Sequence, residues 1–281
     1  MKEIPGWKVI KAFNLKTFEK YCKANQKSFL QDKPYLHIDN GIDSKVLFVA
    51  HLDSVCEYRK SVMTRIHGKE YLFQPILDDR LGVYTIMALL PKLGIIADIL
   101  LITGEESCNS TARIFETTKD YNWIASFDRG GDDVVMYQHK HNTELKTALS
   151  NIGFKDINGG SYSDICELSL GCGGFNVGVG MYDYHTIMSR CDLKEYFKQV
   201  ELFCDFFEVY EKTSFPETGV INWLGYGNMF SGISETGWPE NDKNDIWDNE
   251  KVCGLCESVV DIEEDTCPYC LCTDFHYNVK A

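Results

Sequence analysis

Acidic and imidazole side chains recur in the sequence where apolar segments end. Five places share this pattern: VLFVA is followed by His51 and Asp53, ILLITG by Glu105 and Glu106, WIASF by Asp128, FNVGVGMYDY by His185, and Asp78 and Asp79 precede RLGVYTIMALL. A single acid at the end of a strand is usually a solvated turn residue. Because five such places occur in one chain, the sequence predicts that these side chains meet in one site.

The types of these side chains indicate what such a site would bind. Two imidazoles and several carboxylates, with no thiolate among them, suit a pair of zinc ions that share one bridging carboxylate. Asp53 is placed to hydrogen-bond the far nitrogen of the His51 ring, which would fix its tautomer and raise its basicity. The pair Glu105-Glu106 offers one carboxylate to a metal and one to act as a base.

The elements that must position these residues are predicted by the apolar patterns. We expect strands at 35–39, 45–50, 97–103, 123–128, 134–138 and 175–181. The first two should be neighbouring strands around a turn at 40–41. Helices are expected at 14–25, 80–93, 110–118, 143–151 and 192–212. This alternation predicts an α/β fold, a mostly parallel mixed sheet with helices on both faces, which binds ligands at the carboxyl ends of its strands.

Five motifs, AHLDSV, LDDRLG, TGEES, FDRGG and GMYDYHT, occur in this order between residue 46 and about residue 187. Together they resemble the co-catalytic di-zinc exopeptidases, which include zinc aminopeptidases, carboxypeptidases and acetylornithine-type deacetylases. Two features depart from the family pattern. Cys108 stands where the family often has glycine, and HTIMSRC after His185 lacks a nearby acid.

The resemblance implies a role for each matching residue. His51 and Asp128 would hold the first zinc ion, Glu106 and His185 the second, and Asp78 would bridge both. The remaining matches have supporting roles: Asp53 would orient His51, Glu105 would be the general base, and Asp79 is the less favoured bridge. Cobalt or manganese could replace zinc at this catalytic pair.

The spacing of the motifs indicates which branch of the family the chain resembles. Only 56 residues separate Asp128 from His185, and only 26 separate His51 from Asp78. Neither interval is long enough for the domain that other branches of the family insert there. The compact aminopeptidase branch fits best. The implied reaction is hydrolysis of peptide-like amide bonds by water bridging two zinc ions. An N-acyl amino acid deacylase and a non-catalytic binding protein with the same fold remain alternatives.

Four cysteines near the end of the sequence form a second candidate metal site. Cys253, Cys256, Cys267 and Cys270 follow a C-x2-C, x10, C-x2-C pattern, which suits a closed structural zinc site, a zinc ribbon. We therefore expect three regions: a catalytic domain at 1–213, an acidic irregular linker or arm at 214–250, and the ribbon at 251–281. The ribbon is expected to dock on a protein partner or on the catalytic domain.

The bulk composition restricts the partners and the location of the protein. The net charge is −14, and about −10 of it lies in residues 216–281, which disfavours nucleic acid as a partner. No segment has the pattern of a signal peptide or a membrane span, so a cytoplasmic protein with reduced thiols and a peptide or acyl-amino-acid substrate is expected. His139 and His141 form a further histidine pair, expected at a strand end near the site.

Overall fold

The computed structural model describes residues 6–41, 43, 45–158 and 162–217, together with the backbone of three short strands nearer the end of the chain. The chain divides into two compact units, Met1–Gly219 and Val220–Ala281. None of the helices in the described part of the chain is long and apolar enough to cross a membrane.

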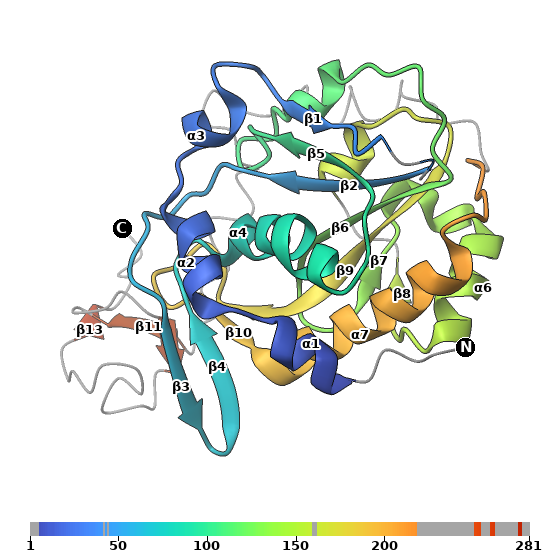
Figure 1. Cartoon of the computed structure of the whole chain (residues 1–281). Helices are drawn as coiled ribbons and strands as arrows, with labels where there is room; N and C mark the ends of the chain where they lie inside the picture. The colour runs from blue at the N-terminus through green and yellow to red at the C-terminus, as the bar shows by residue number, and fades with distance from the viewer. Residues whose placement is uncertain are drawn as a thin grey trace. The chain divides into compact units, whose positions relative to one another are not determined.

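A mixed sheet forms the centre of the first unit, with the strand order β1-β5-β2-β6-β9-β10-β4-β3 (Figure 1). The four central strands β5, β2, β6 and β9 are parallel, and the outer strands are antiparallel to their neighbours. The strands are β1 (Leu36–Ile38), β2 (Val46–His51), β3 (Val62–Ile66), β4 (Lys69–Phe73), β5 (Asp98–Ile102), β6 (Trp123–Gly130), β7 (Val134–Val135), β8 (Ile157–Asn158), β9 (Gly173–Tyr182) and β10 (Arg190–Asp192). The predicted fold, a mostly parallel mixed sheet with helices, is confirmed.

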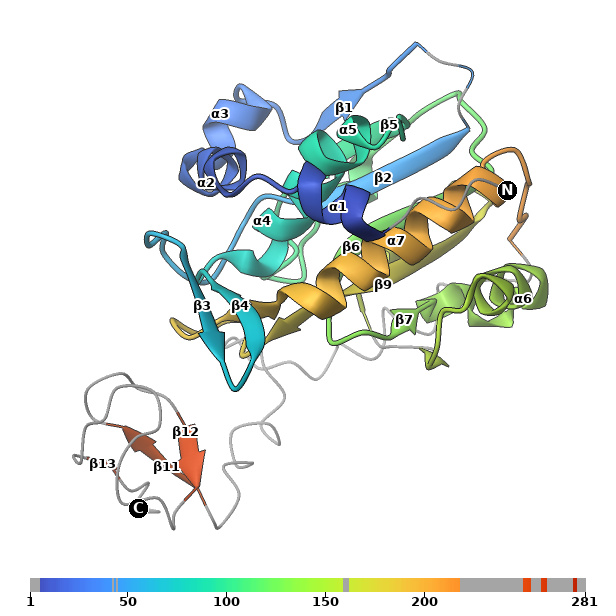
Figure 2. The same ribbon diagram turned by 60° about the horizontal axis from the view of Figure 1, so that its bottom comes forward.

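Helices cover one face of this sheet and connect its strands. They are α1 (Gly6–Ala12), α2 (Leu15–Lys23), α3 (Gln26–Leu30), α4 (Leu77–Tyr84), the π-helix η1 (Thr85–Leu89), α5 (Leu90–Lys92), α6 (Thr143–Ile152) and α7 (Leu193–Tyr210). Figure 2 shows α7 running along β9 with α1 beside it. α7 buries Phe203 and Phe207 against Trp123 and Phe48 of the sheet, because these phenylalanines are four residues apart on one helix face.

The other face of the sheet is covered by short 3-10 helices. They are η2 (Thr111–Ile114) and η4 (Asp164–Glu167), while η3 (Tyr137–His141) packs against β9. Ala112 and Ile165 from η2 and η4 join a second apolar cluster with Leu47, Val49 and Leu100 of the central strands. Since both faces are covered, every residue of β2 and β5 is buried, as in most parallel sheets.

Three predictions about individual elements are wrong. β1 and β2 are not neighbours, because β5 lies between them and pairs with both. Residues 110–118 form only the 3-10 helix η2, in which Ser110 bonds the backbone N–H of Ala112. The strand expected at 134–138 ends after two residues, so His139 and His141 lie in η3.

A hairpin that the sequence analysis did not predict projects from the body of the first unit (Figure 1). β3 and β4 are joined at His67 and Gly68, both of which have positive φ, as two-residue hairpin turns require. In the sequence, the dipeptide His67-Gly68 between the segments VMTRI and KEYLF was the signal for this turn.

In the second unit, the described strands form a small antiparallel sheet, β12-β11-β13. The strands are β11 (Glu250–Cys253), β12 (Val259–Asp261) and β13 (Phe275–His276). The backbone of Cys253 is the end of β11, and the other three cysteines of the predicted ribbon lie outside the described residues.

Candidate metal centre

The predicted active-site residues meet at the carboxyl ends of the central strands. His51 is the last residue of β2, Glu105 and Glu106 follow β5, Asp128 lies near the end of β6, and His185 follows β9. Because these four strands are parallel and adjacent, their carboxyl ends share one edge of the sheet. The first residues of α4 reach the same edge and bring the acidic pair Asp78-Asp79 there.

Asp78 lies between the two histidines. Its Oδ1 is 2.9 Å from His51 Nε2, and its Oδ2 is 3.1 Å from His185 Nε2. His185 Nε2 is also 3.0 Å from Glu106 Oε2. One carboxylate therefore faces both imidazoles with separate oxygens, which is the geometry expected of a carboxylate that bridges two metal ions.

The remaining acids surround His51. Its Nε2 is 3.5 Å from Asp128 Oδ1 and 4.0 Å from Glu105 Oε2. Ligand atoms of His51, Asp78 and Glu106 lie within 4.8 Å of one another, and so do those of His51, Asp79 and Asp128. Both groupings contain His51 and share the edge of the sheet, so the arrangement is a candidate di-metal site.

Asp79 has contacts of a different kind from those of Asp78. Its Oδ2 accepts the backbone N–H of His51 at 3.2 Å, and its Oδ1 accepts that of Gly82 at 3.0 Å. A Cβ at position 82 would collide with the Asp79 carboxylate, so a glycine is needed there. Asp79 thus ties the end of β2 to the start of α4, which supports Asp78 as the bridging residue.

Asp53 connects the two loops that carry the site. Its Oδ1 accepts the N–H of Gly104 at 2.8 Å, and its Oδ2 accepts that of Glu106 at 3.0 Å. His51 Nδ1 lies 3.1 Å from the Asp53 carbonyl oxygen and 3.5 Å from Oδ1. The far side of the imidazole therefore meets two acceptors of Asp53, and the same carboxylate fixes the Glu105-Glu106 loop.

The donor set fits cations. Two buried carboxylate oxygens, Glu106 Oε1 and Asp128 Oδ1, have no hydrogen-bond partner within the part of the chain that the structure describes. Burial together with the charges of the neighbouring aspartates raises the pKa of Asp128. Hydrogen bonds with Asp78 and Glu106 raise the pKa of His185 to about 10. Protons on the acid and imidazole groups thus balance the clustered negative charge, and divalent cations bound by the same atoms would displace those protons.

Two buried residues that the sequence analysis did not assign lie close to the site. Asn176 of β9 accepts the backbone N–H of Asp128 at 2.9 Å and donates to the Tyr137 hydroxyl at 3.0 Å. Asp164 is buried, and burial raises its pKa to about 8. A polar residue inside the apolar segment FNVGVG was the signal for Asn176.

The structure does not bring His139 and His141 to this site. His139 is buried beside Gly174, near the amino end of β9, with Nδ1 3.9 Å from Glu217 Oε1. Burial lowers the pKa of His139 to about 4.

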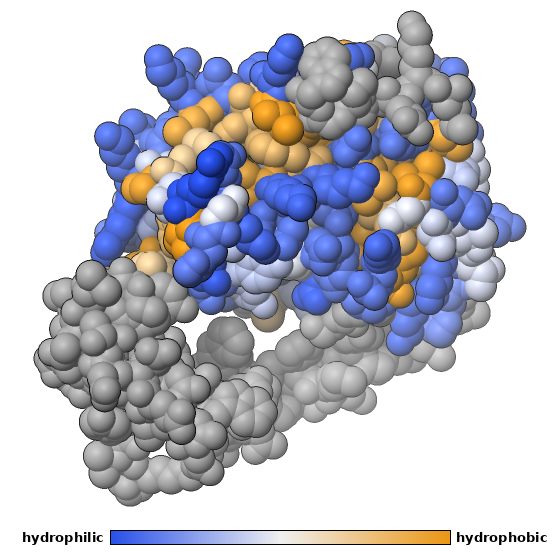
Figure 3. All heavy atoms as spheres, turned by 90° about the horizontal axis from the view of Figure 1, so that it is seen from below, coloured by the Kyte–Doolittle hydropathy of each residue, from blue (hydrophilic) through white to orange (hydrophobic). Residues whose placement is uncertain are grey.

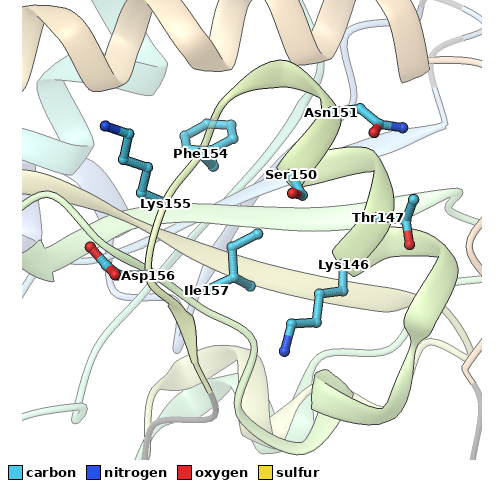
Figure 4. A pocket seen from close by; sticks show the side chains of 8 residues that line it. All are labelled: Lys146, Thr147, Ser150, Asn151, Phe154, Lys155, Asp156 and Ile157. Carbon is cyan, nitrogen blue, oxygen red and sulfur yellow. The ribbon is translucent and has the colours of Figure 1, made fainter.

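A separate hollow of about 630 Å³ is lined by residues of α6 and the segment after it, among them Lys146, Phe154 and Lys155 (Figure 4), and it includes no residue of the candidate metal centre.

No protein-family profile and no curated protein matches the sequence. Among solved structures, the chain is similar to the aminopeptidase PepT from Bacillus cereus (12% identity, 73% of this chain and 92% of that chain, TM-score 0.46). It is also similar to a tripeptidase from Staphylococcus aureus (10%, 75% and 100%, 0.47) and to the TET1 peptidase from Pyrococcus horikoshii (11%, 67% and 98%, 0.45). All three are named as peptidases.

Proposed function

We propose that this protein is a metal-dependent aminopeptidase. The observation that carries the proposal is the Asp78 carboxylate, which faces His51 with one oxygen and His185 with the other. A single bound ion would need only one of these oxygens. Two ions would use both histidines together with the carboxylates of Asp78, Glu106 and Asp128.

The proposed ligands are His51 and Asp128 for one ion, Glu106 and His185 for the other, and Asp78 for both. Nitrogen and oxygen donors of this kind suit zinc, with cobalt or manganese as possible substitutes. Such ions, when bound, polarise the scissile carbonyl and make a water acidic.

Glu105 is the proposed general base. It lies near the cluster without belonging to either group of ligand atoms, and its Oε2 is 4.0 Å from His51 Nε2. Burial, reinforced by neighbouring acids, raises its pKa, which increases its affinity for a proton. In the proposed reaction Glu105 takes a proton from the attacking water and gives it to the leaving amine.

The surroundings of the arginines favour a substrate with a free amine. A deacylase needs a cation for the carboxylate of its substrate, and Arg80, Arg129 and Arg190 adjoin the motifs. Arg129 pairs with Asp133 at 3.2 Å, and Arg190 pairs with Asp183.

The third arginine, Arg80, is buried, and its guanidinium carbon is 5.6 Å from the centre of the Phe29 ring. Arg129 and Arg190 therefore have carboxylate partners, whereas the buried Nε and Nη1 of Arg80 have no hydrogen-bond partner within the described residues. The acidic site instead suits an ammonium group, which an aminopeptidase must recognise. A deacylase would have to use Arg80 or another cation, such as the exposed Arg59.

A matched pair of substrates tests the proposal. Leucine anilide with a free amine and its N-acetylated form would be incubated with the metal-loaded protein, with Glu105→Gln as the inactive control. We expect anilide release from the free amine only. Removal of the acetyl group from N-acetyl-leucine, which keeps the free carboxylate that a deacylase binds, would establish the deacylase, and loss of this activity in Arg59→Ala would identify the carboxylate-binding cation. Activity on none of these compounds, nor on a panel of other aminoacyl anilides, would favour a non-catalytic binding protein.

The proposal includes the second metal site. Cys253, Cys256, Cys267 and Cys270 are proposed to hold a structural zinc ion in a ribbon at 251–281, after a catalytic domain at 1–213 and an acidic arm at 214–250. The cysteine spacing supports this assignment. A cytoplasmic location and docking of the ribbon on a protein surface stay predictions.

A further inference from the structure

The loop that carries His185 is held firmly in place. At its start Asp183 pairs with Arg190, whose guanidinium lies over the ring of Tyr182. Within the loop the Thr186 hydroxyl donates to the Asp183 carbonyl at 2.6 Å and accepts the N–H of Met188 at 3.1 Å. These contacts fix the conformation of the residues between them, including Tyr184.

Tyr184 lies beside two parts of the metal centre. Its ring meets the His185 ring edge to face, with centroids 5.0 Å apart and an interplanar angle of 89°. On its other side, Tyr184 Cε1 is 3.2 Å from where a Cβ of Gly130 would lie, two residues after Asp128. The ring therefore extends from one proposed ligand towards the strand that carries another. It nevertheless remains 46% exposed.

Two further large apolar side chains are exposed close in sequence to proposed site residues. Val55 is 56% exposed and follows Asp53 by two residues, and Ile187 is 37% exposed and follows His185 by two. Asp53 accepts the backbone N–H of Glu106 at 3.0 Å, so the start of the loop after β2 lies against the loop that carries a proposed ligand. The loop after β2 therefore also borders the site.

Exposure alone is common on this protein. The face in Figure 3 shows several hydrophobic patches among hydrophilic side chains, and Ile10 and Val209 are exposed on α1 and α7. What distinguishes Tyr184, Val55 and Ile187 is that they lie on the loops that carry His185 and Asp53. Apolar surface beside a cluster of carboxylates complements a ligand with an ammonium group and an apolar side chain.

We propose that Tyr184, Val55 and Ile187 form the wall that receives the side chain of the substrate's N-terminal residue. The enzyme then selects peptides that begin with a large apolar residue. This inference rests on the proposed aminopeptidase function. In such a substrate one carbon atom joins the free amine, the scissile carbonyl and the side chain. Because the amine and the carbonyl must both lie at the metal centre, the side chain must lie against the groups that border it.

The test compares anilides of leucine, phenylalanine, alanine and lysine by kcat/KM. We expect the wild type to prefer leucine over alanine by about 10-fold or more, since contacts with an apolar pocket discriminate by roughly 10–200-fold. Tyr184→Ala should reduce this ratio by about 10-fold. Tyr184→Phe should keep the ratio, because the ring and not the hydroxyl forms the wall.

Matched variants make the result specific. Val55→Ser, at an exposed position, should also lower the leucine-to-alanine ratio, and it carries the test if Tyr184→Ala loses metal. Val209→Ala removes a comparable exposed side chain on α7 and should leave the ratio unchanged. A wild-type preference for alanine or lysine, or a ratio that neither Tyr184→Ala nor Val55→Ser alters, would overturn the inference while leaving the aminopeptidase function intact. A wild type inactive on every free-amine substrate would overturn both.

Discussion

Replacing Asp53 with asparagine tests how the site is held together. The substitution keeps the size of the side chain and removes its charge. In the structure the Asp53 carboxylate accepts two backbone N–H groups, from Gly104 at 2.8 Å and Glu106 at 3.0 Å. Asparagine offers only one acceptor oxygen, so one of these N–H groups would face an amide NH2 group. The orientation of His51 and of the Glu105-Glu106 loop would both be less well fixed.

The magnitude can be estimated in two ways. A hydrogen bond to a charged group stabilises by roughly 1.5–3 kcal/mol, and Asp53→Asn removes about one such bond near the ligands. Changing a residue that orients metal ligands typically lowers metal affinity by about 10–100-fold, which corresponds to roughly 1.4–2.8 kcal/mol. The two estimates agree, so we expect metal affinity to fall by about 10–100-fold in Asp53→Asn.

Competition with a coloured chelator measures this affinity, and elemental analysis gives the number of ions bound. Asp192→Asn is the control for the loss of a carboxylate charge, because Asp192 Oδ1 accepts the backbone N–H groups of Lys194 at 3.0 Å and Glu195 at 3.4 Å, while its Oδ2 pairs with Lys69 at 3.0 Å. Asparagine keeps the capping oxygen and loses the ion pair, so Asp192→Asn should leave metal affinity within about threefold. If Asp53→Asn binds metal as tightly as the wild type does, the role assigned to Asp53 is wrong.

Three further predictions follow from the site, the ribbon and a buried acid. Glu105→Gln should retain its metal ions and lose about 10²–10⁴-fold in kcat, and near-normal turnover would exclude Glu105 as the base. The double variant Cys253→Ser with Cys256→Ser should bind two ions per chain instead of three. Proteolysis should remove its last residues without loss of peptidase activity. Cooperative unfolding of the whole chain would contradict the domain boundary. Burial raises the pKa of Asp164 to about 8, against 3.8 ordinarily, so the folded protein retains a proton that the unfolded chain loses. The stability of the metal-free protein should therefore fall as pH rises from about 4 through 8, and thermal melts of Asp164→Asn should show a weaker fall; equal slopes would count against this.

Local patterns in the sequence were enough to predict most of the fold. Segments such as VLFVA and ILLI are apolar throughout because both faces of a parallel strand are covered, and α7 shows helical spacing over its whole length. The pairing of strands was not predictable in the same way. β1 and β2 are close in the sequence, yet β5 lies between them, since pairing depends on residues far apart in the chain. The helix predicted at 110–118 has helical spacing but forms only a short 3-10 turn.

The sequence by itself determined which residue types stand at the ends of the apolar segments, and through them the resemblance to the di-zinc exopeptidases. It did so because each strand end is a local feature that apolar periodicity reveals. Only the tertiary structure decided which contacts each of these residues makes. Asp78 lies between the two histidines, and Asp79 accepts backbone N–H groups of β2 and α4. Asp53 accepts the backbone N–H of Glu106. Apart from the contact of Asp79 with Gly82, these contacts join residues 27 to 107 positions apart, and their distances depend on the packing of strands and loops, which no local pattern encodes.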